Sequence, residues 1–225
     1  MQMRNLIKEK IAANGYAVGA FVASSSATNC EILAMNGYDF VIIDCEHAQT
    51  DSETAVNMFR ACEMYGMAPM VRVYNPYDGP MMSRLLDVGA HGIMVPLVND
   101  APQAKNIVDN TKYAPVGRRG ANGGRGPRWG AYDDYVKVCN DNTLTFVQCE
   151  SIEGVNNIEE IAALPGVDGV FIGTGDLSLE MGIKFKADSS ANHTVDSPEM
   201  VAAIDKILQA CLKNGKIPGC LLYTS

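Results

Sequence analysis

Four apolar segments of the sequence each end in polar residues that could carry out acid–base or metal chemistry. The first runs into Asp44 and His47, and the second contains Arg72 near its end. Glu150 and Asp176 follow the other two. If these segments are parallel β-strands, their carboxyl ends lie at one edge of the same sheet, where the connecting loops converge. A single ionisable group in such a place is ordinary, but four segments that all end this way predict a functional site.

Glu150 and Asp176 are candidate metal ligands. Two carboxylates supply the oxygen ligands that Mg²⁺ or Mn²⁺ prefers, and they leave positions for water and substrate. The alternative is that each carboxylate caps the helix expected after it. Gly173 and Gly175 favour a functional interpretation of Asp176, because glycine lets backbone N–H groups approach a carboxylate or phosphate closely.

His47 and Arg72 are candidates for proton transfer and charge stabilisation. A histidine just past a buried strand can act as a general base near neutral pH. The alternative is a structural loop histidine that is hydrogen-bonded to Asp44, three residues earlier. Arg72 ends an apolar strand, where an uncompensated charge is costly, so it needs an anionic partner. That partner is either a protein carboxylate or an oxyanion that develops during a reaction.

Two further charged features suggest specific partners. Asp87 lies near the end of an expected helix, where the helix dipole disfavours an acid, so a partner such as His47 or exposure to solvent would account for it. The Gly- and Arg-rich loop of residues 117–130 is long for a connector, which indicates a functional or partly mobile segment. Its arginines could bind an anionic substrate or acids of a neighbouring subunit. Nucleic acid is a poorer fit, because Trp129 is the one aromatic residue among them.

The elements that must position these residues alternate along the chain. Short apolar, β-branched segments, expected to be strands, cover residues 17–23, 40–45, 68–73, 92–97, 144–149, 169–172 and 217–222. Segments with helical periodicity cover residues 27–36, 52–65, 79–88, 101–111, 132–140, 154–163 and 197–214. This alternation predicts a parallel sheet covered by helices, either an open doubly wound sheet or a closed (β/α)8 barrel. The barrel is favoured, because no G-x-G-x-x-G segment follows the first strand.

Composition places the chain among cytoplasmic enzymes or binding proteins. The 225 residues are 47% hydrophobic and carry a net charge of −8, which disfavours a general nucleic-acid binder. No apolar run approaches the roughly 20 residues that a membrane span needs, and the N-terminus lacks the features of a secretory signal. Seven cysteines without a C-x-x-C pair fit buried thiols in a reducing compartment. We treat residues 1–225 as one domain.

The count of expected strands is one short of a complete barrel. Seven are evident, and the last, at residues 217–222, is followed by three residues only. A barrel usually needs about 250 residues. We therefore expect a chain that is truncated before the eighth strand and the last helix.

Several motifs in order resemble the HpcH/HpaI aldolase family, which comprises metal-dependent class II pyruvate aldolases related to the citrate lyase β-chain. The resemblance extends from about residue 15 to the C-terminus. It rests on GYDFVIIDCEHA (37–48), VRV (71–73), LLDVGAHGIMVP (85–96), GRRG (117–120), VQCES (147–151) and VDGVFIGTGDLS (167–178). The paired motifs D-x-E-H and G-x-x-D-L-S are specific when they occur in this order.

The resemblance implies a (β/α)8 TIM barrel of the phosphoenolpyruvate/pyruvate type, assembled as a homohexamer that is a trimer of dimers. It implies that Glu150 and Asp176 bind the divalent cation, which is Mg²⁺, Mn²⁺ or Co²⁺. His47 resembles the catalytic base, with Asp87 tuning its basicity and Asp44 nearby. Arg72 resembles the group that stabilises the enolate oxygen. Asp176 and the backbone around Thr174 and Gly175 resemble the seat of the substrate carboxylate.

The implied activity is reversible retro-aldol cleavage of a 4-hydroxy-2-oxo acid, such as a 2-keto-3-deoxy sugar acid, to pyruvate and an aldehyde through a metal-bound pyruvate enolate. No candidate strand end carries a lysine, which argues against a Schiff-base aldolase. Gly175 departs from the Ala or Ser of many relatives, so no relative's substrate is carried over. Two alternatives remain: a citrate-synthase-like or other condensing enzyme that uses the same enolate, and a non-catalytic barrel that binds 2-oxo acids.

Overall fold

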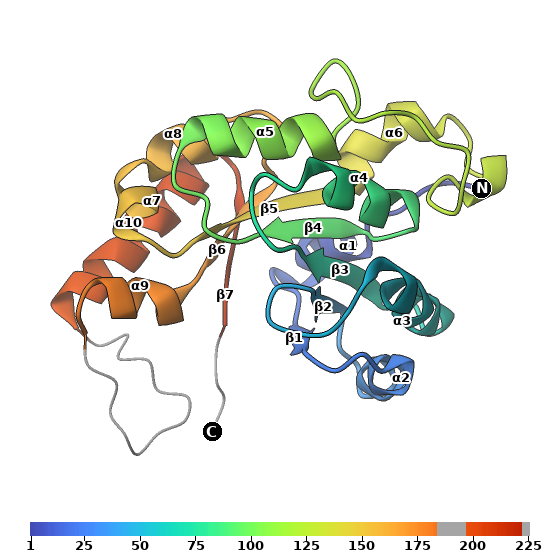
Figure 1. The fold of residues 1–225 in the computed structure, drawn as a ribbon, viewed down its shortest axis with the longest axis horizontal. Coiled ribbons are helices and arrows are strands. Elements are labelled where there is room, and N and C mark those ends of the chain that lie inside the picture. The colour runs from blue at the N-terminus through green and yellow to red at the C-terminus, as the bar shows by residue number, and fades with distance from the viewer. Residues whose placement is uncertain (184–196, 222–225) are drawn as a thin grey trace.

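The computed structural model describes residues 1–183 and 197–221, and these form a curled sheet of seven parallel strands (Figure 1). The strands pair in their order along the chain, from β1 to β7. Their bounds are β1 Gly19–Val22, β2 Phe40–Asp44, β3 Ala68–Arg72, β4 Gly92–Val95, β5 Leu144–Cys149, β6 Gly169–Ile172 and β7 Ile217–Cys220. A doubly wound sheet reverses its strand order at a switch point, so this sequential order excludes that alternative.

The helices that connect the strands cover the outer face of the sheet, whereas the helix before β1 packs against the inner-face side chains (Figure 1). They are α1 Leu6–Asn14, α2 Ala27–Met35, α3 Ser52–Met64, α4 Gly79–Asp87, α5 Ala101–Thr111, α6 Tyr135–Asn142, α7 Ile152–Asn156, α8 Ile158–Ala163, α9 Thr174–Glu180 and α10 Pro198–Lys213, with the short 3-10 helix η1 at Arg128–Gly130. Neighbouring helices pack against one another in the pairs α2–α3, α4–α5, α5–α8 and α8–α10. Parallel strands need such crossover connections, which here contain the helices.

The side chains of each strand alternate between the two faces of the sheet. The outer face packs against the helices and includes Val41, Ile43, Val71, Ile93, Val147 and Val170. The inner face forms a separate apolar cluster, here called the inner cluster, which contains Ile42, Met70, Met94, Phe146 and Phe171. Two residues further along β2, β3 and β5, the same inner face carries Asp44, Arg72 and Gln148. The strand period therefore turns these polar groups toward the inside of the curl.

The strands lie within two residues of the expected segments, whereas several helices differ from the expectation. The helix expected at residues 132–140 lies at Tyr135–Asn142, and the one expected at 154–163 is divided into α7 and α8. The division falls at Asn157, whose side-chain amide donates to the carbonyl oxygen of Asn99 (2.9 Å). The helix α9 was not expected, because its seven residues are too few to show a helical period. His193, which its polar sequence surroundings indicate to be a structural loop residue, lies outside the described residues.

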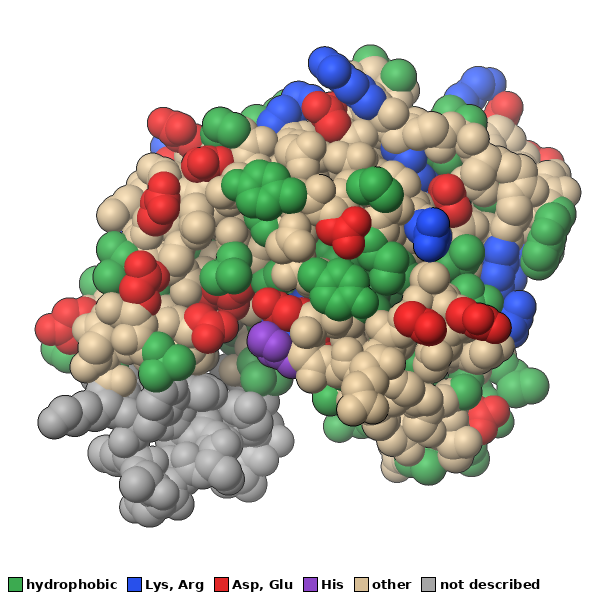
Figure 2. Space-filling model, viewed as in Figure 1, with side chains coloured by type: hydrophobic (Ala, Val, Ile, Leu, Met, Phe, Trp, Pro, Cys, Tyr) green, Lys and Arg blue, Asp and Glu red, His purple; other side chains and the backbone are tan. Residues whose placement is uncertain are grey.

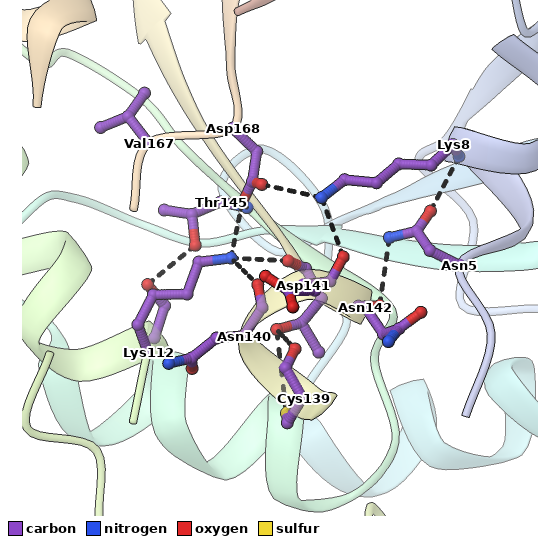
Figure 3. A network of polar contacts seen from close by, with 12 residues as sticks. Asn5, Lys8, Lys112, Cys139, Asn140, Asp141, Asn142, Thr145, Val167 and Asp168 are labelled. Carbon is purple, nitrogen blue, oxygen red and sulfur yellow. Dashed lines mark hydrogen bonds and ion pairs between the residues drawn. The ribbon is translucent and has the colours of Figure 1, made fainter. Parts of the chain in front are cut away.

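A buried ammonium group ties together the amino ends of the strands (Figure 3). Lys112, which is 1% exposed, donates from Nζ to the carbonyl oxygens of Asn140 (2.9 Å) and Thr143 (2.7 Å) and to Oδ2 of Asp168 (2.6 Å). Lys8 of α1 lies 3.2 Å from the other oxygen of Asp168. Burial lowers the pKa of Lys112, although Asp168 opposes that shift. The network joins α1, the end of α5, the α6–β5 connection and the start of β6.

We expect Lys112→Met to destabilise the fold by about 3 kcal/mol, because it removes the ammonium donor of two carbonyl oxygens and the buried positive charge beside Asp168. Asp168 then keeps the backbone N–H of Thr145 and the side chain of Lys8. The free energy of unfolding from urea titration measures this loss. The control is Lys105→Met, since Lys105 is half-exposed and pairs with Asp109 on the surface of α5. The control should change stability by less than about 0.5 kcal/mol. Equal stability of the two variants would contradict a structural role for the network.

The outer surface carries charges of both signs. In Figure 2 the acidic side chains are spread over the viewed face, and no continuous basic surface covers that face. Among the helices that the structure describes, none is both long enough and apolar enough to cross a membrane.

Candidate active site

The carboxyl ends of β2 and β3 carry a buried ion pair on the inner face. Arg72 donates from Nε to Oδ1 of Asp44 (3.0 Å) and from Nη2 to Oδ2 (2.7 Å), which is a bidentate arrangement. Parallel pairing sets these two residues directly opposite each other, which makes the contact possible. Burial would raise the pKa of Asp44, but its hydrogen bonds and its attraction to Arg72 lower the pKa overall. Asp44 is therefore an ionised carboxylate that fixes the guanidinium.

Two more groups hold the Arg72 guanidinium in place. Its Nη1 lies 3.1 Å from a carboxylate oxygen of Glu46, and the guanidinium carbon lies 5.0 Å from the centre of the Phe21 ring. The Phe21 ring in turn meets Phe171 edge to face, with the ring centres 5.8 Å apart. A guanidinium stacked on an aromatic face and paired with two carboxylates has little freedom to reorient. Arg72 is thus a preorganised positive charge.

His47 lies at the rim of the site, with 66% of its side chain exposed. Its Nε2 is 3.7 Å from a carboxylate oxygen of Glu46. Its backbone N–H donates to Oδ1 of Asp44 (3.3 Å), as does that of Glu46 (3.0 Å). The carboxylate of Asp44 therefore shapes the turn after β2, whereas the imidazole of His47 remains accessible to a substrate.

Glu150 is buried immediately after β5, on the same inner face as Gln148. One carboxylate oxygen accepts the backbone N–H of Leu97 (2.8 Å), and the other accepts the side-chain amide of Gln148. The pKa of Glu150 is raised to about 7, mainly by burial; the backbone hydrogen bond from Leu97 opposes this shift, and the negative charges of Asp176 and Glu46 contribute to it. Glu46, Glu150 and Asp176 therefore lie close enough to repel one another.

The backbone contacts Glu150 closely at two positions. A Cβ atom at Gly173 would lie 2.4 Å from Oε2 of Glu150, so a larger residue there would displace the carboxylate. Leu97 has a φ of 53°, which is unfavourable for a non-glycine residue. Its N–H is nevertheless the donor to Glu150, so a strained backbone is held where it meets the buried acid.

The remaining predicted residues occupy the start of α9. Thr174 is buried, Gly175 is half-buried and Asp176 is exposed in the first turn of the helix. Gly173 stands at the N-cap position without a side-chain cap, so the first backbone N–H groups of α9 have no capping oxygen from it. Asp176 adds its charge to the same acidic group as Glu150.

Asp87 is not brought to this site within one copy of the chain. It ends α4, and its Oδ1 accepts hydrogen bonds from Arg119 (2.7 Å) and Asn122 (2.6 Å). The suggested contact with His47 is therefore replaced by a contact with the arginine-rich loop. Arg119 belongs to the loop whose arginines were expected to bind an anionic substrate or acids of a neighbouring subunit, whereas here it binds an acid of its own chain.

Three further site residues were missed at the sequence level. Gln148 could have been found as a polar residue inside an apolar strand, two positions before Glu150 and so on the same face. Glu46 directly precedes His47, and its position indicated a partner for Arg72. Phe21 gave no signal, because its stacking on Arg72 depends on the curl of the sheet.

The donor set fits a hard divalent cation. The carboxylates of Glu150 and Asp176 supply oxygen, and the side-chain oxygen of Gln148 is buried without a hydrogen-bond partner among the described residues. Oxygen donors of this kind suit Mg²⁺ or Mn²⁺. No cluster of three or more His, Cys, Asp or Glu side chains arranged for a metal occurs in the described part of the chain. A cation held here would therefore keep coordination positions for substrate or water.

Comparisons with known proteins agree with this arrangement. The model of the HpcH/HpaI aldolase/citrate lyase family matches residues 17–221. The hydroxypyruvate/pyruvate aldolase of Chromohalobacter salexigens is 39% identical over 207 residues, which cover 90% of this chain and 77% of that protein. The 2-keto-3-deoxy-L-rhamnonate aldolase of Escherichia coli is 34% identical over 223 residues, covering 97% and 79%.

A solved structure gives the same result for the fold. The crystal structure of an HpcH/HpaI aldolase from Desulfitobacterium hafniense superimposes with a TM-score of 0.88 at 28% identity, covering 99% of this chain and 83% of that one. The family match spans most of the chain, and the relatives are similar over more than two thirds of their own length. The chain therefore belongs to the HpcH/HpaI aldolase/citrate lyase family.

Proposed function

We propose that this chain cleaves a 4-hydroxy-2-oxo acid reversibly to pyruvate and an aldehyde at the site formed by His47, Arg72, Glu150 and Asp176. The similarity to aldolases over most of the chain makes it a carbon–carbon lyase of the aldolase type. The observation that carries the assignment of the site is the clamped guanidinium of Arg72 on the same inner face as the buried Glu150.

Glu150 and Asp176 would hold a divalent cation, with Gln148 as a further oxygen donor. When bound, such a cation supplies Lewis-acid polarisation of the 2-oxo acid. Whether it is Mg²⁺, Mn²⁺ or Co²⁺ belongs to the proposal. A bound cation would also favour the ionised form of Glu150, offsetting the burial and the charge repulsion that together raise its pKa.

Arg72 would stabilise the negative charge that develops on the substrate oxygen at C2 when the C3–C4 bond breaks. Its orientation is set before the reaction by Asp44, Glu46 and Phe21, so it needs no reorganisation as charge develops. The backbone around Thr174 and Gly175, at the start of α9, would receive the substrate carboxylate.

His47 would take the proton from the C4 hydroxyl in the cleavage direction, directly or through a water molecule. The electron pair of the O–H bond then forms the aldehyde carbonyl, and the C3–C4 bonding pair passes to the three-carbon fragment. That fragment gains a proton at C3 to become pyruvate. Asp44 supports His47 through its backbone, while the tuning of His47 by Asp87 stays a prediction.

The barrel type, the oligomeric state and the cellular location also belong to the proposal. The sequential order of parallel strands and the polar groups at their carboxyl ends support a barrel of the (β/α)8 type. A homohexamer in the cytoplasm, with small-molecule 2-oxo acids and aldehydes as its partners, remains our expectation from the resemblance.

Exchange of the pyruvate methyl protons in D₂O tests the site, because it requires proton removal next to the carbonyl but no aldehyde. We expect exchange, followed by NMR, that needs Mn²⁺ or Mg²⁺ and stops with EDTA. His47→Ala should slow it by about 100-fold, as expected for loss of a general base.

The control is His91→Gln, which changes a histidine that lies at the other end of the strands. Provided that circular dichroism shows this variant to be folded, it should catalyse exchange of the pyruvate methyl protons at the rate of the unsubstituted protein. Exchange that is independent of metal, or absent from folded and metal-loaded protein, would overturn the proposal. A product that lacks the aldehyde-derived hydroxyl would identify a condensing enzyme instead, and exchange without any bond cleavage would favour a binding protein.

A further inference from the structure

A polar pocket opens at the end of the sheet opposite to the candidate active site. Its volume is about 460 Å³, and its lining residues are Arg60, Glu63, Met64, Arg125, Arg128 and Trp129. Glu63 and Met64 end α3, just before β3 begins, and the others belong mainly to the loop before α6. The pocket is thus at the amino ends of the strands, separated from Arg72 by roughly 15 Å, the length of a five-residue strand.

The pocket carries more positive than negative charge. Glu63 accepts from Nη2 of Arg125 (2.7 Å) and lies 2.8 Å from Nη2 of Arg128, so one carboxylate is shared by two guanidinium groups. Arg60 is exposed and donates to the side-chain oxygen of Asn57 (2.6 Å), and within the described residues it has no acidic partner. Three guanidinium groups and a single carboxylate therefore line this pocket, in a chain whose net charge is −8.

The surroundings of Glu63 also indicate a positive local potential. His91 lies beside it, with Nε2 4.0 Å from a Glu63 oxygen and with Nδ1 buried without a hydrogen-bond partner in the described part of the chain. The pKa of His91 is lowered to about 4, mainly by burial; the attraction of Glu63 opposes this shift, and the charges of Arg128 and Arg125 contribute to it. His91 is therefore neutral, and the arginine charge dominates this region.

The loop presents its aromatic residue at considerable conformational cost. Arg128 and Trp129 have φ angles of 53° and 51°, which are both left-handed and unfavourable for these residue types. The N–H of Trp129 donates to the carbonyl oxygen of Gly124 (2.9 Å), which fixes the turn. The Trp129 side chain is nonetheless largely exposed at the pocket. Exposure of its apolar ring to water does not compensate for the conformational cost of the turn.

We propose that this pocket binds a small phosphate-bearing anion at a site separate from the reaction. Guanidinium groups match phosphate oxygens in pairs of hydrogen bonds, and a doubly charged anion would balance the excess of arginine. Arg60 supplies the unpaired guanidinium, and Arg128, which is part-exposed, supplies the second. The faces of Trp129 and Met64 would contact an organic portion of the same ligand.

The chain contains one tryptophan, so the fluorescence of Trp129 reports directly on this pocket. Inorganic phosphate is titrated into the full chain at constant ionic strength, with KCl as the compensating salt. We expect a saturable change in emission. Arg60→Gln should weaken the phosphate affinity by about tenfold or more, because it removes a charge-assisted contact without disturbing Glu63.

The matched control is Arg118→Gln. Arg118 belongs to the same loop region, its side chain is 85% exposed, and it does not line the pocket, so its substitution should leave the titration unchanged. Glycerol phosphate is titrated in parallel. Tighter binding than that of inorganic phosphate indicates a phosphate monoester as the ligand, and equal binding indicates free phosphate.

Three results would overturn the proposal. The first is the absence of a saturable change in folded protein, and the second is the same affinity in Arg60→Gln. The third is emission that depends on protein concentration without added anion, since a second copy of the chain would then cover the pocket. None of these results depends on catalysis, so the proposed function stands or fails separately.

Discussion

Replacing Arg72 by lysine is expected to slow metal-dependent exchange of the pyruvate methyl protons by about 10²–10³-fold, the cost of losing one aligned donor to a developing oxyanion. Lysine keeps the positive charge but cannot make the bidentate contact with Asp44, the contact with Glu46 and the stacking on Phe21 together. The ammonium group would therefore lack a fixed position. Initial rates of exchange by NMR at saturating Mn²⁺ measure the effect.

The control for this prediction is Arg118→Lys, an exchange of the same two residue types on the exposed loop surface. It should leave the exchange rate unchanged. A nearly unchanged rate in Arg72→Lys would show that the charge alone is sufficient and would contradict the role given to its orientation. Circular dichroism shows whether Arg72→Lys is folded. If it is not, Phe21→Leu is the second variant, because it removes the stacking on Arg72 and leaves both carboxylate contacts of Arg72 in place.

Glu150→Gln is expected to abolish metal-dependent exchange and, in metal-free protein, to stabilise the fold at neutral pH. The buried carboxyl has a pKa of about 7, compared with about 4.3 in an unfolded chain. Between these values the folded state binds more protons than the unfolded state, so stability falls as pH rises from about 4 to about 7. Across this pH range the free energy of unfolding falls by about 2–4 kcal/mol. The glutamine variant avoids this loss, because its side chain stays neutral.

Urea titrations of EDTA-treated protein at several pH values measure this difference. The unsubstituted protein should lose stability relative to Glu150→Gln as the pH rises through that range, and the gap should close when Mn²⁺ is added. Glu153→Gln is the control, because Glu153 is exposed on α7 nearby and should change neither stability nor exchange. A Glu150→Gln variant that retains exchange would remove Glu150 from the cation site.

Much of the site could be predicted because strand ends are recognisable in the sequence. Asp44, Arg72 and Glu150 each terminate an apolar segment, and parallel pairing brings such ends to one edge. The family is likewise confirmed, since its motifs are local and ordered. The missed helix α9 and the break at Asn157 show the opposite case, in which short elements carry too little periodicity to be detected.

Contacts across the curl could not be predicted in the same way. Nothing in the order of residues indicated that Phe21 stacks on Arg72 or that Leu97 donates to Glu150, since both contacts join distant segments. The same holds for Asp87, whose position near the end of an expected helix suggested His47 as a partner. Its actual partners, Arg119 and Asn122, lie on a loop that the sequence left without structure.

The sequence by itself determined the alternation of strands and helices and the residue types at the strand ends, because apolar periodicity and turn residues are local properties. The tertiary structure decided which of those residues meet. In near-continuous apolar strands, the sequence does not say which alternate side chains face the inside, and the sheet must curl before Asp44, Arg72, Gln148 and Glu150 share one face. Packing against the helices makes that choice, since it buries Val41 and Ile43 outward and so turns Asp44 inward.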